Sequence, residues 1–205
     1  MAPLVAPRRP VNGNQQRADR TRALVIDETI RCILEEGFAA ASAKHITERA
    51  GVTSGVVQYH FGDRDGLLMA VVDQGFAELT DALSELPAAA ENVRDRAEFI
   101  VNAAWEAFSS ATSMAALEIL IGTRAMRDTG ASEHLAELGT TFVKLGKHIG
   151  KGLAARHAAA IGNLIWATLR GLVVAALVVP EPLDTRRERR TLVEMITRYV
   201  DGVTA

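Results

Sequence analysis

Residues 42–67 constrain the fold more than any other part of the chain, because they read as two short helices on either side of a glycine turn. Ile46 and Ala50 lie four residues apart and share one helical face, and Gly51 follows them where the chain must turn. A second short helix ends in Gln58-Tyr59-His60-Phe61. Two such helices predict a helix-turn-helix, whose second helix reads the major groove of DNA.

The second helix offers polar side chains on the face opposite its apolar residues. A glutamine such as Gln58 can bond adenine through two hydrogen bonds, and serine or tyrosine hydroxyls can bond phosphate. Thr53 is expected to cap this helix, and Asp63 to cap the next one, whose first turn holds Arg64 where a phosphate is attracted. The predicted DNA-contacting residues are Arg22, Ser42, Lys44, Thr53, Ser54, Val56, Gln58, Tyr59, His60 and Arg64.

Residues 22–68 resemble the DNA-binding domain of the tetracycline-repressor (TetR) family of bacterial regulators. The matching residues are Arg22 before an apolar helix, Glu36-Gly37-Phe38, Ile46, Glu48-Arg49-Ala50-Gly51-Val52, Gly55, Tyr59-His60-Phe61, Arg64 and Leu67. The sequence departs from the family pattern at three positions, which are Thr47, Gln58 and Arg64. The resemblance implies an all-helical, homodimeric repressor whose C-terminal domain binds a small molecule. Gln58 changes the chemistry offered to DNA, so the operator sequence cannot be taken from relatives.

The rest of the chain predicts more helices and no strands, so we expect an all-α protein of about nine helices. The expected helices cover 21–37, 43–50, 54–60, 63–85, 91–109, 113–127, 132–154, 157–179 and 184–199. The expected domains are a flexible basic arm at 1–20, a three-helix helix-turn-helix domain at 21–66 and an effector-binding and dimerisation domain at 67–205. The net charge is only −2, but residues 1–22 carry five arginines against one acidic residue. The arm is either a tail without a specific role or a source of extra DNA contacts.

Two apolar stripes near the C-terminus predict the dimer interface. The stripes recur at three- and four-residue steps and would build a four-helix bundle from two subunits, in agreement with the family resemblance. The predicted interface residues are Gly162, Trp166, Leu169, Val173, Leu192, Ile196 and Tyr199. The alternative is that both stripes pack within one subunit. Asn163 and Arg170 interrupt the apolar run of the first stripe, so we expect no membrane span.

The central helices combine apolar walls with a few polar groups, which is typical of a ligand pocket but also of an ordinary core. The predicted pocket residues are Asn102, Trp105, Leu120, Thr123, Arg124, Phe142 and Trp166. The walls favour an apolar or amphipathic effector, and Arg124 could bind its carboxylate or phosphate group. The basic run at 185–190 is interpreted as a solvated helix face rather than a second nucleic-acid site, because Glu188 interrupts it.

Catalysis finds no support in the sequence. The five histidines lack metal-ligand spacing, and neither a phosphate-binding glycine loop nor a nucleophile elbow is present. We therefore expect no enzyme activity, cofactor or metal. The single cysteine, Cys32, is expected to be a small buried residue, with a redox sensor as the alternative, and one cysteine fits a reducing cytoplasm.

These features predict a dimeric, cytoplasmic regulator that binds a palindromic DNA operator. The leading hypothesis is a repressor that a small apolar or amphipathic ligand releases from DNA. The alternative is a DNA-binding regulator without an effector, acting as an activator or under the control of a partner.

Overall fold

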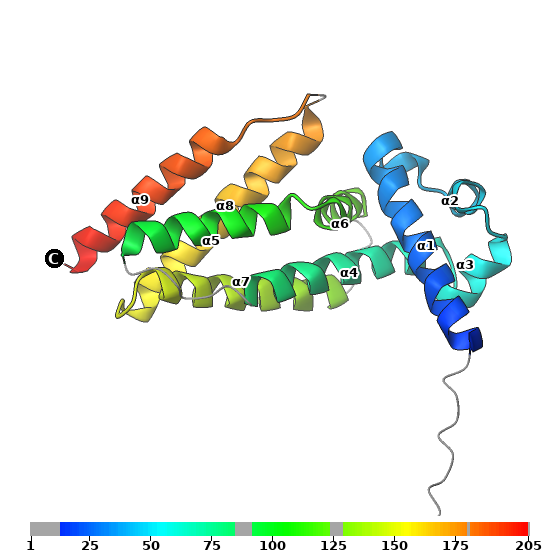
Figure 1. Ribbon diagram of the computed structural model, residues 1–205, viewed down its shortest axis with the longest axis horizontal. Coiled ribbons are helices and arrows are strands. Elements are labelled where there is room, and N and C mark those ends of the chain that lie inside the picture. Colours follow the sequence, from blue (N-terminus) through cyan, green and yellow to red (C-terminus); the bar gives the residue numbers. More distant parts are fainter. Residues whose placement is uncertain (1–12, 85–91, 124–128, 180, 205) are drawn as a thin grey trace, which may run out of the picture. The chain divides into compact units, whose positions relative to one another are not determined.

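A computed structural model describes residues 13–84, 92–123, 129–179 and 181–204 of the chain. Within these ranges the regular structure is entirely helical, with nine α-helices and one short 3-10 helix (Figure 1). The prediction of an all-α fold is therefore confirmed. The chain forms two compact units, residues 1–67 and residues 68–205.

The first unit contains α1 (Gly13–Glu36), the 3-10 helix η1 (Phe38–Ala40), α2 (Ala43–Ala50), α3 (Ser54–Phe61) and the first residues of α4 (Arg64–Ser84). Its core joins buried side chains of four helices, namely Val25, Ile26 and Ile33 of α1, Ile46 of α2, Val57 of α3 and Leu67 of α4. The side chains that face this core on α1 and α2 fix the position of α3, the predicted reader of DNA.

Helix α1 begins eight residues earlier than the sequence predicted. Residues 13–20 were expected to belong to a flexible arm, but Arg17 and Arg20 lie within α1. Glutamine, arginine and alanine are good helix formers although they carry no apolar pattern, and Gln15 bonds Asp19 across one turn at 3.2 Å. The remaining part of the predicted arm, residues 1–12, lies outside the described residues.

The second unit contains the rest of α4 with α5 (Val93–Phe108), α6 (Ala111–Gly122), α7 (Thr129–Ile149), α8 (Ala155–Val178) and α9 (Arg186–Thr204). Polar caps fix two of the helix starts. The Asn92 side chain accepts the backbone N–H of Asp95 at 2.8 Å, and the Ser110 hydroxyl accepts that of Ser113 at 3.2 Å. These bonds satisfy N–H groups that have no partner inside the helix.

Helices α7 and α8 pack with their backbones in direct contact at two glycines. A Cβ atom on Gly146 would lie 2.0 Å from the carbonyl oxygen of Ala158, and one on Gly162 would lie 2.1 Å from that of Phe142. Only glycine fits at such distances, and both glycines lie inside their helices. Gly162 was predicted to face a second subunit, but it faces α7 of its own chain.

The apolar stripes that the sequence assigned to the dimer interface pack inside the single chain. Leu169 is 0% exposed and Leu192 is 3% exposed, and Val173 and Ile196 are equally buried. Their prediction as interface residues is therefore corrected in favour of the alternative, packing within one subunit. Trp166 is half-buried, and Tyr199 keeps 40% of its surface exposed.

Helix α8 is the one described helix that is long and apolar enough to cross a membrane by length and composition. The core helix of a soluble protein passes the same test. One side of α8 is a buried stripe that includes Ile161, Ile165 and Leu169, which accounts for part of its apolar character.

Candidate nucleic-acid interface and ligand cavity

The turn between α2 and α3 has the geometry that the sequence predicted. The Ser42 hydroxyl caps α2 by accepting the backbone N–H of His45 at 3.2 Å. Gly51 ends α2 with φ 65° and ψ 29°, a left-handed conformation that glycine adopts without a steric cost. Thr53 differs from the prediction, because its side chain forms no capping bond and only its carbonyl oxygen accepts the N–H of Val56, at 3.0 Å.

Helix α3 presents polar and aromatic side chains to the solvent. Val57 points into the core and is 4% exposed, whereas Tyr59 is 80% exposed. Ser54 and Gln58 are exposed as well. The exposed tyrosine hydroxyl can bond phosphate, and the neighbouring Gln58 can read a base edge.

The side chains of α2 extend this face. Ser42 and Lys44 are exposed. The Lys44 ammonium group lies 3.8 Å from the Glu48 carboxylate in a loose pair, and the Lys44 side chain is 86% exposed. Lys44 is therefore free to move to a phosphate. Val56 and His60 are half-buried, and the rings of Tyr59 and His60 meet edge to face with centroids 4.8 Å apart.

Two arginines predicted to contact DNA are engaged within the protein. Arg64 donates from Nε to the carbonyl oxygen of Ala41 at 2.6 Å, and its guanidinium lies 5.0 Å from the centre of the Phe38 ring. The guanidinium of Arg22 lies 5.4 Å from the centre of the Phe61 ring. Asp63 behaves as predicted and accepts the N–H of Gly66 at 2.8 Å.

Arg49 joins α2 to α1 through a network that the sequence did not reveal. Its Nε donates to Glu28 at 2.7 Å and its Nη2 to Glu35 at 2.7 Å, and Nη1 also binds Glu36. Hydrogen bonds from Glu35 and Glu28 raise the pKa of the Arg49 guanidinium. The partners lie 13 to 21 residues away in the sequence, so no local pattern indicates them.

A cavity of about 290 Å³ opens between helices of the second unit. Its walls come from α4, α5, α6, α7 and α8, and they include Phe76, Leu120 and Trp166, with Arg170 among the lining residues. The guanidinium of Arg170 lies 5.4 Å from the centre of the Trp166 ring. Ser113 also belongs to the cavity wall, and its hydroxyl is buried and has no hydrogen-bond partner among the described residues. An apolar cavity with a few polar groups is typical of a small-molecule site.

The structure distributes the predicted pocket residues over three places. Leu120 and Trp166 line the cavity, and the ring of Phe142 packs against that of Trp166 with centroids 5.2 Å apart. Asn102 and Trp105 instead face α9, because Arg189 donates to Asn102 at 2.5 Å and lies 5.3 Å from the centre of the Trp105 ring.

Thr123 is not among the residues that line the cavity. Thr123 closes α6 by donating to the carbonyl oxygen of Ile119 at 2.7 Å. Arg124 lies outside the described residues. Among the described residues of the cavity wall, the polar side chains are Ser113 and Arg170, which the sequence analysis did not select.

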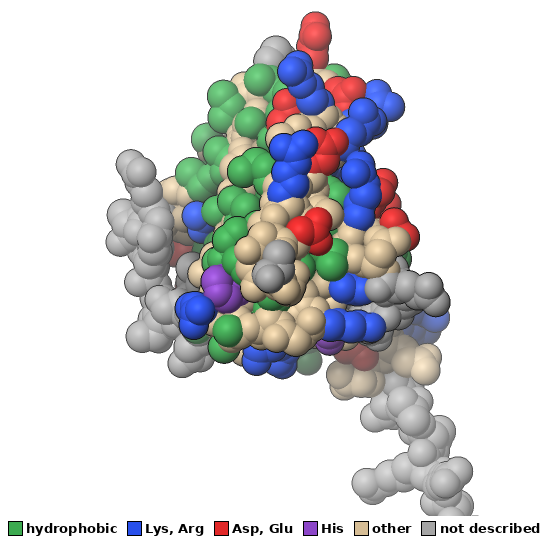
Figure 2. Space-filling view, turned by 90° about the vertical axis from the view of Figure 1, so that its left-hand side faces the viewer, with side chains coloured by type: hydrophobic (Ala, Val, Ile, Leu, Met, Phe, Trp, Pro, Cys, Tyr) green, Lys and Arg blue, Asp and Glu red, His purple; other side chains and the backbone are tan. Residues whose placement is uncertain are grey.

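A second apolar surface remains exposed on α8 and α9. On α8 the exposed residues Ala160, Leu164, Ala167, Gly171, Ala175 and Val178 recur at steps of three and four and so share one helical face. Met195, Tyr199 and Val203 form an exposed stripe on α9 and are 38 to 56% exposed. Figure 2, which views the molecule from the end where α9 terminates, shows a continuous band of hydrophobic side chains beside a column of charged ones.

Residues 25–71 match the model of the family described as "Bacterial regulatory proteins, tetR family". The match runs from the buried middle of α1 through α2 and α3 into α4, so it contains the whole helix-turn-helix. The chain belongs to the TetR family of transcriptional regulators. It is therefore a DNA-binding regulator of transcription rather than an enzyme.

Relatives support this assignment over nearly the whole chain. The transcriptional regulator BetI of Burkholderia mallei is 26% identical over 187 residues, which cover 90% of this chain and 93% of BetI. BetI of Burkholderia ambifaria is 27% identical and covers 80% of this chain and 86% of its own. Both matches extend far beyond residue 71, where the match to the family model ends.

Solved structures show the same fold. A transcriptional regulator from Rhodococcus sp. Rha1 gives a TM-score of 0.68 at 23% identity and covers 88% of this chain and 96% of its own. The fatty acid degradation regulator FadR from Bacillus halodurans gives a TM-score of 0.65 at 18% identity and covers 88% of this chain and 94% of FadR. NalD, the secondary repressor of a multidrug efflux pump in Pseudomonas aeruginosa, gives a TM-score of 0.61 at 21% identity and covers 90% of this chain and 97% of NalD.

Proposed function

We propose that this TetR-family regulator is a cytoplasmic homodimer that represses transcription from a palindromic operator and leaves it when a small ligand binds the second unit. The single observation that carries the proposal is the exposed face of α3, where the side chains of Gln58 and Tyr59 point into solvent close to the turn at Gly51. A helix of eight residues contacts too few bases to select one site alone. Two copies in successive major grooves, about 34–36 Å apart, would read two half-sites.

The exposed faces of α8 and α9 support a dimer. The residues that face outward on α8 are mostly small, so a second copy of the helix could approach closely, and Leu164 and Val178 would supply apolar contacts. On α9, Tyr199 is held in place because its hydroxyl lies 2.6 Å from Nδ1 of His157 on α8. Two such helices from each subunit make a four-helix bundle. This interface uses the outer faces of the helices that the sequence selected, rather than their buried stripes.

The experiment that tests DNA reading begins with selection of a bound sequence from a random DNA library by the purified full chain. The selected site should be a palindrome. Gln58→Ala should then relax the preference at one base pair of each half-site, because a bidentate glutamine contact contributes about 1–3 kcal/mol of discrimination. Gln74→Ala is the matched control, since Gln74 bonds Glu78 on α4 at 2.8 Å and lies outside the reader. A library that yields no palindrome, or an unchanged preference in Gln58→Ala, would contradict the proposal.

The cavity supports an effector with an apolar body and one polar group. Its apolar walls suit a hydrocarbon or aromatic portion, the Ser113 hydroxyl can donate one hydrogen bond, and Arg170 can pair with an anionic group. Acyl compounds have this combination, and FadR, a structural neighbour, is named for fatty acid degradation. We therefore place medium-length carboxylates and acyl derivatives first among candidate effectors.

An effector releases the operator only if it binds one dimer conformation better than the other. A tenfold loss of operator affinity requires about 1.4 kcal/mol of differential binding, which one apolar molecule can supply. The test follows operator release during titration with carboxylates of increasing chain length. Leu120→Trp, which fills part of the cavity, should abolish the response, whereas Trp105→Phe on the α9 side should keep it. A dimer that releases DNA for no ligand would favour the regulator without an effector.

A further inference from the structure

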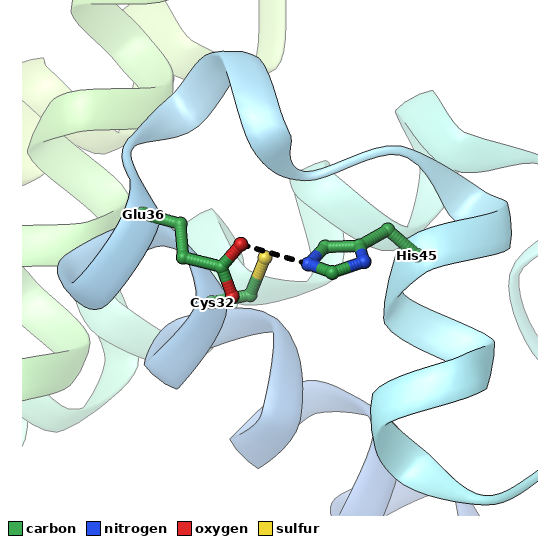
Figure 3. Close-up of side chains that lie close together, drawn as sticks. All are labelled: Cys32, Glu36 and His45. Carbon is green, nitrogen blue, oxygen red and sulfur yellow. Dashed lines mark hydrogen bonds and ion pairs between the residues drawn. The ribbon is translucent and has the colours of Figure 1, made fainter.

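Three metal-ligating side chains meet between the end of α1 and the start of α2. Cys32 and Glu36 lie one turn apart on α1, and His45 reaches toward them from α2 (Figure 3). One ligand atom from each lies within 4.8 Å of the other two. Nε2 of His45 lies 2.9 Å from Oε2 of Glu36, and Figure 3 shows the Cys32 sulfur beside this pair. None of the three takes part in the proposed DNA face or the cavity.

We propose that Cys32, Glu36 and His45 bind a divalent cation of the zinc class in the DNA-binding unit. A thiolate, an imidazole and a carboxylate are the ligands that Zn²⁺ prefers, and Zn–ligand distances of about 2.0–2.3 Å place tetrahedral ligands roughly 3.3–3.8 Å apart. The three atoms lie within 4.8 Å of one another, and side-chain rotations would bring them to that separation. Sites with three protein ligands keep the fourth position for water or another small ligand.

The approach to the site is open on one side. Cys32 is 0% exposed, whereas the side chains of Glu36 and His45 keep 37% and 38% of their surface exposed. An ion can therefore enter between the imidazole and the carboxylate and meet the sulfur behind them. Small side-chain rotations are enough, because the His45–Glu36 hydrogen bond has only to widen. The thiol proton leaves to solvent when the sulfur binds the metal.

The charges around the cluster also favour a cation. Glu28, Glu35 and Glu36 lie on the same end of α1 as the sulfur, and the nearby guanidiniums that pair with them belong to Arg31 and Arg49. Three carboxylates against two guanidiniums leave one negative charge before the metal arrives. Arg49 binds Glu36 through Oε1 and leaves Oε2, now bonded to His45, available as the ligand.

A bound ion would connect two helices that differ in function. His45 is the third residue of α2, three residues after the cap Ser42 and next to Lys44, both on the proposed DNA face. The metal would bind the folded unit and not the unfolded chain, so it would raise the melting temperature in a concentration-dependent way.

The test uses the full chain and Co²⁺ as a spectroscopic substitute for Zn²⁺. Because Cys32 is the single cysteine of the chain, a thiolate-to-cobalt charge-transfer band in the near ultraviolet reports binding at this site alone. We expect the band together with visible d–d bands of tetrahedral intensity, displacement of both by one equivalent of Zn²⁺, and a higher melting temperature with Zn²⁺. A folded protein that shows no charge-transfer band would overturn the proposal.

Matched variants separate the cluster from its surroundings. Glu36→Gln and His45→Ala should each weaken Zn²⁺ binding by at least about 10–100-fold, the range seen when even an outer partner of a metal ligand is lost. Glu35→Gln removes the same charge one residue earlier and should weaken binding far less than Glu36→Gln, because Glu35 supplies only part of the surrounding charge. His148→Ala, at an exposed histidine of α7, should leave the affinity unchanged. Both ligand positions are partly exposed, so these variants should fold even if Cys32→Ser does not. Equal affinity in Glu36→Gln and Glu35→Gln would show that the cluster is not the site.

Discussion

Arg64 at the start of α4 donates a hydrogen bond from Nε to the carbonyl oxygen of Ala41, at 2.6 Å and across 23 residues of sequence. Ala41 is fully buried and directly precedes the cap of α2. The bond therefore attaches the entrance of the helix-turn-helix to the helix that leaves it. Arg64 has a structural partner that a purely DNA-contacting arginine would not need.

Loss of the Arg64 side chain should lower the stability of the folded protein even in the absence of DNA. A hydrogen bond from a charged donor contributes about 1.5–3 kcal/mol and an exposed cation–π contact about 0.5–1 kcal/mol. We expect Arg64→Ala to lower the free energy of unfolding by about 2 kcal/mol in urea denaturation. Arg64→Lys should recover only part, because a lysine lacks the planar fork that serves both partners. Equal stability of the alanine variant and the parent would mean that the bond contributes nothing.

Lys44 is the better candidate for a contact to phosphate. Its side chain is 86% exposed and held only by a loose pair with Glu48. Lys44→Ala should weaken binding to all DNA sequences alike and reduce the slope of log K against log salt by about one unit. Lys147→Ala on α7, far along the sequence from the reader, serves as the control. A change in sequence preference without a change in slope would argue against a phosphate contact.

Charges on the exposed face of α8 and α9 should dissociate the dimer. Leu164 is 38% exposed and Met195 is 56% exposed, so Leu164→Glu and Met195→Glu leave the core of the single chain intact. We expect soluble, helical monomers by light scattering and circular dichroism, with operator affinity reduced along with the dimer. Leu169→Asp would not give this information, because Leu169 is buried in its own subunit. Phe99→Glu, at an apolar residue of α5 that is 44% exposed, should remain dimeric.

The start of α9 should respond to acid. The Asp184 carboxylate accepts hydrogen bonds from the Arg186 guanidinium and from its backbone N–H, which lowers the pKa of Asp184 to about 2. Because the folded pKa lies below the unfolded value of about 3.9, the contribution to stability is complete above pH 4 and disappears as the pH falls toward 2. Asp184→Asn should flatten the acid side of the stability curve between these values. An identical curve would exclude Asp184 as a source of acid sensitivity.

Local chemistry made the first unit predictable. The cap Ser42, the turn residue Gly51 and the cap Asp63 each act on a neighbour within three residues, so their positions in the sequence define both ends of α2 and the start of α4. The Arg49 network and the bond between Arg64 and Ala41 depend on residues that only the folded chain brings together. The sequence alone therefore predicted the helices but not the bond from Arg64 to Ala41, and the predicted DNA contact of Arg64 stays a prediction.

In the second unit, the spacing of apolar residues could not decide which face of a helix is buried. Helix α8 is apolar on most sides, so a spacing of three and four residues fits both its buried stripe with Leu169 and its exposed face with Leu164. Only the packing against α7, set by Gly146 and Gly162, decides which face points inward. The same reason explains the pocket: Asn102 lies on an apparently suitable helix but faces α9, where Arg189 binds it.

If the cavity holds the proposed effector, the unpaired hydroxyl of Ser113 would influence which molecules of similar size it accepts. A guest without an acceptor would leave the hydroxyl unbonded, which costs about 1–3 kcal/mol, whereas a guest that accepts its proton would avoid this penalty. Hydrocarbons that fill the same volume would then bind more weakly by roughly one to two orders of magnitude. A regulator with such a cavity could ignore the abundant apolar molecules around it and answer only to those that carry an oxygen at the right depth.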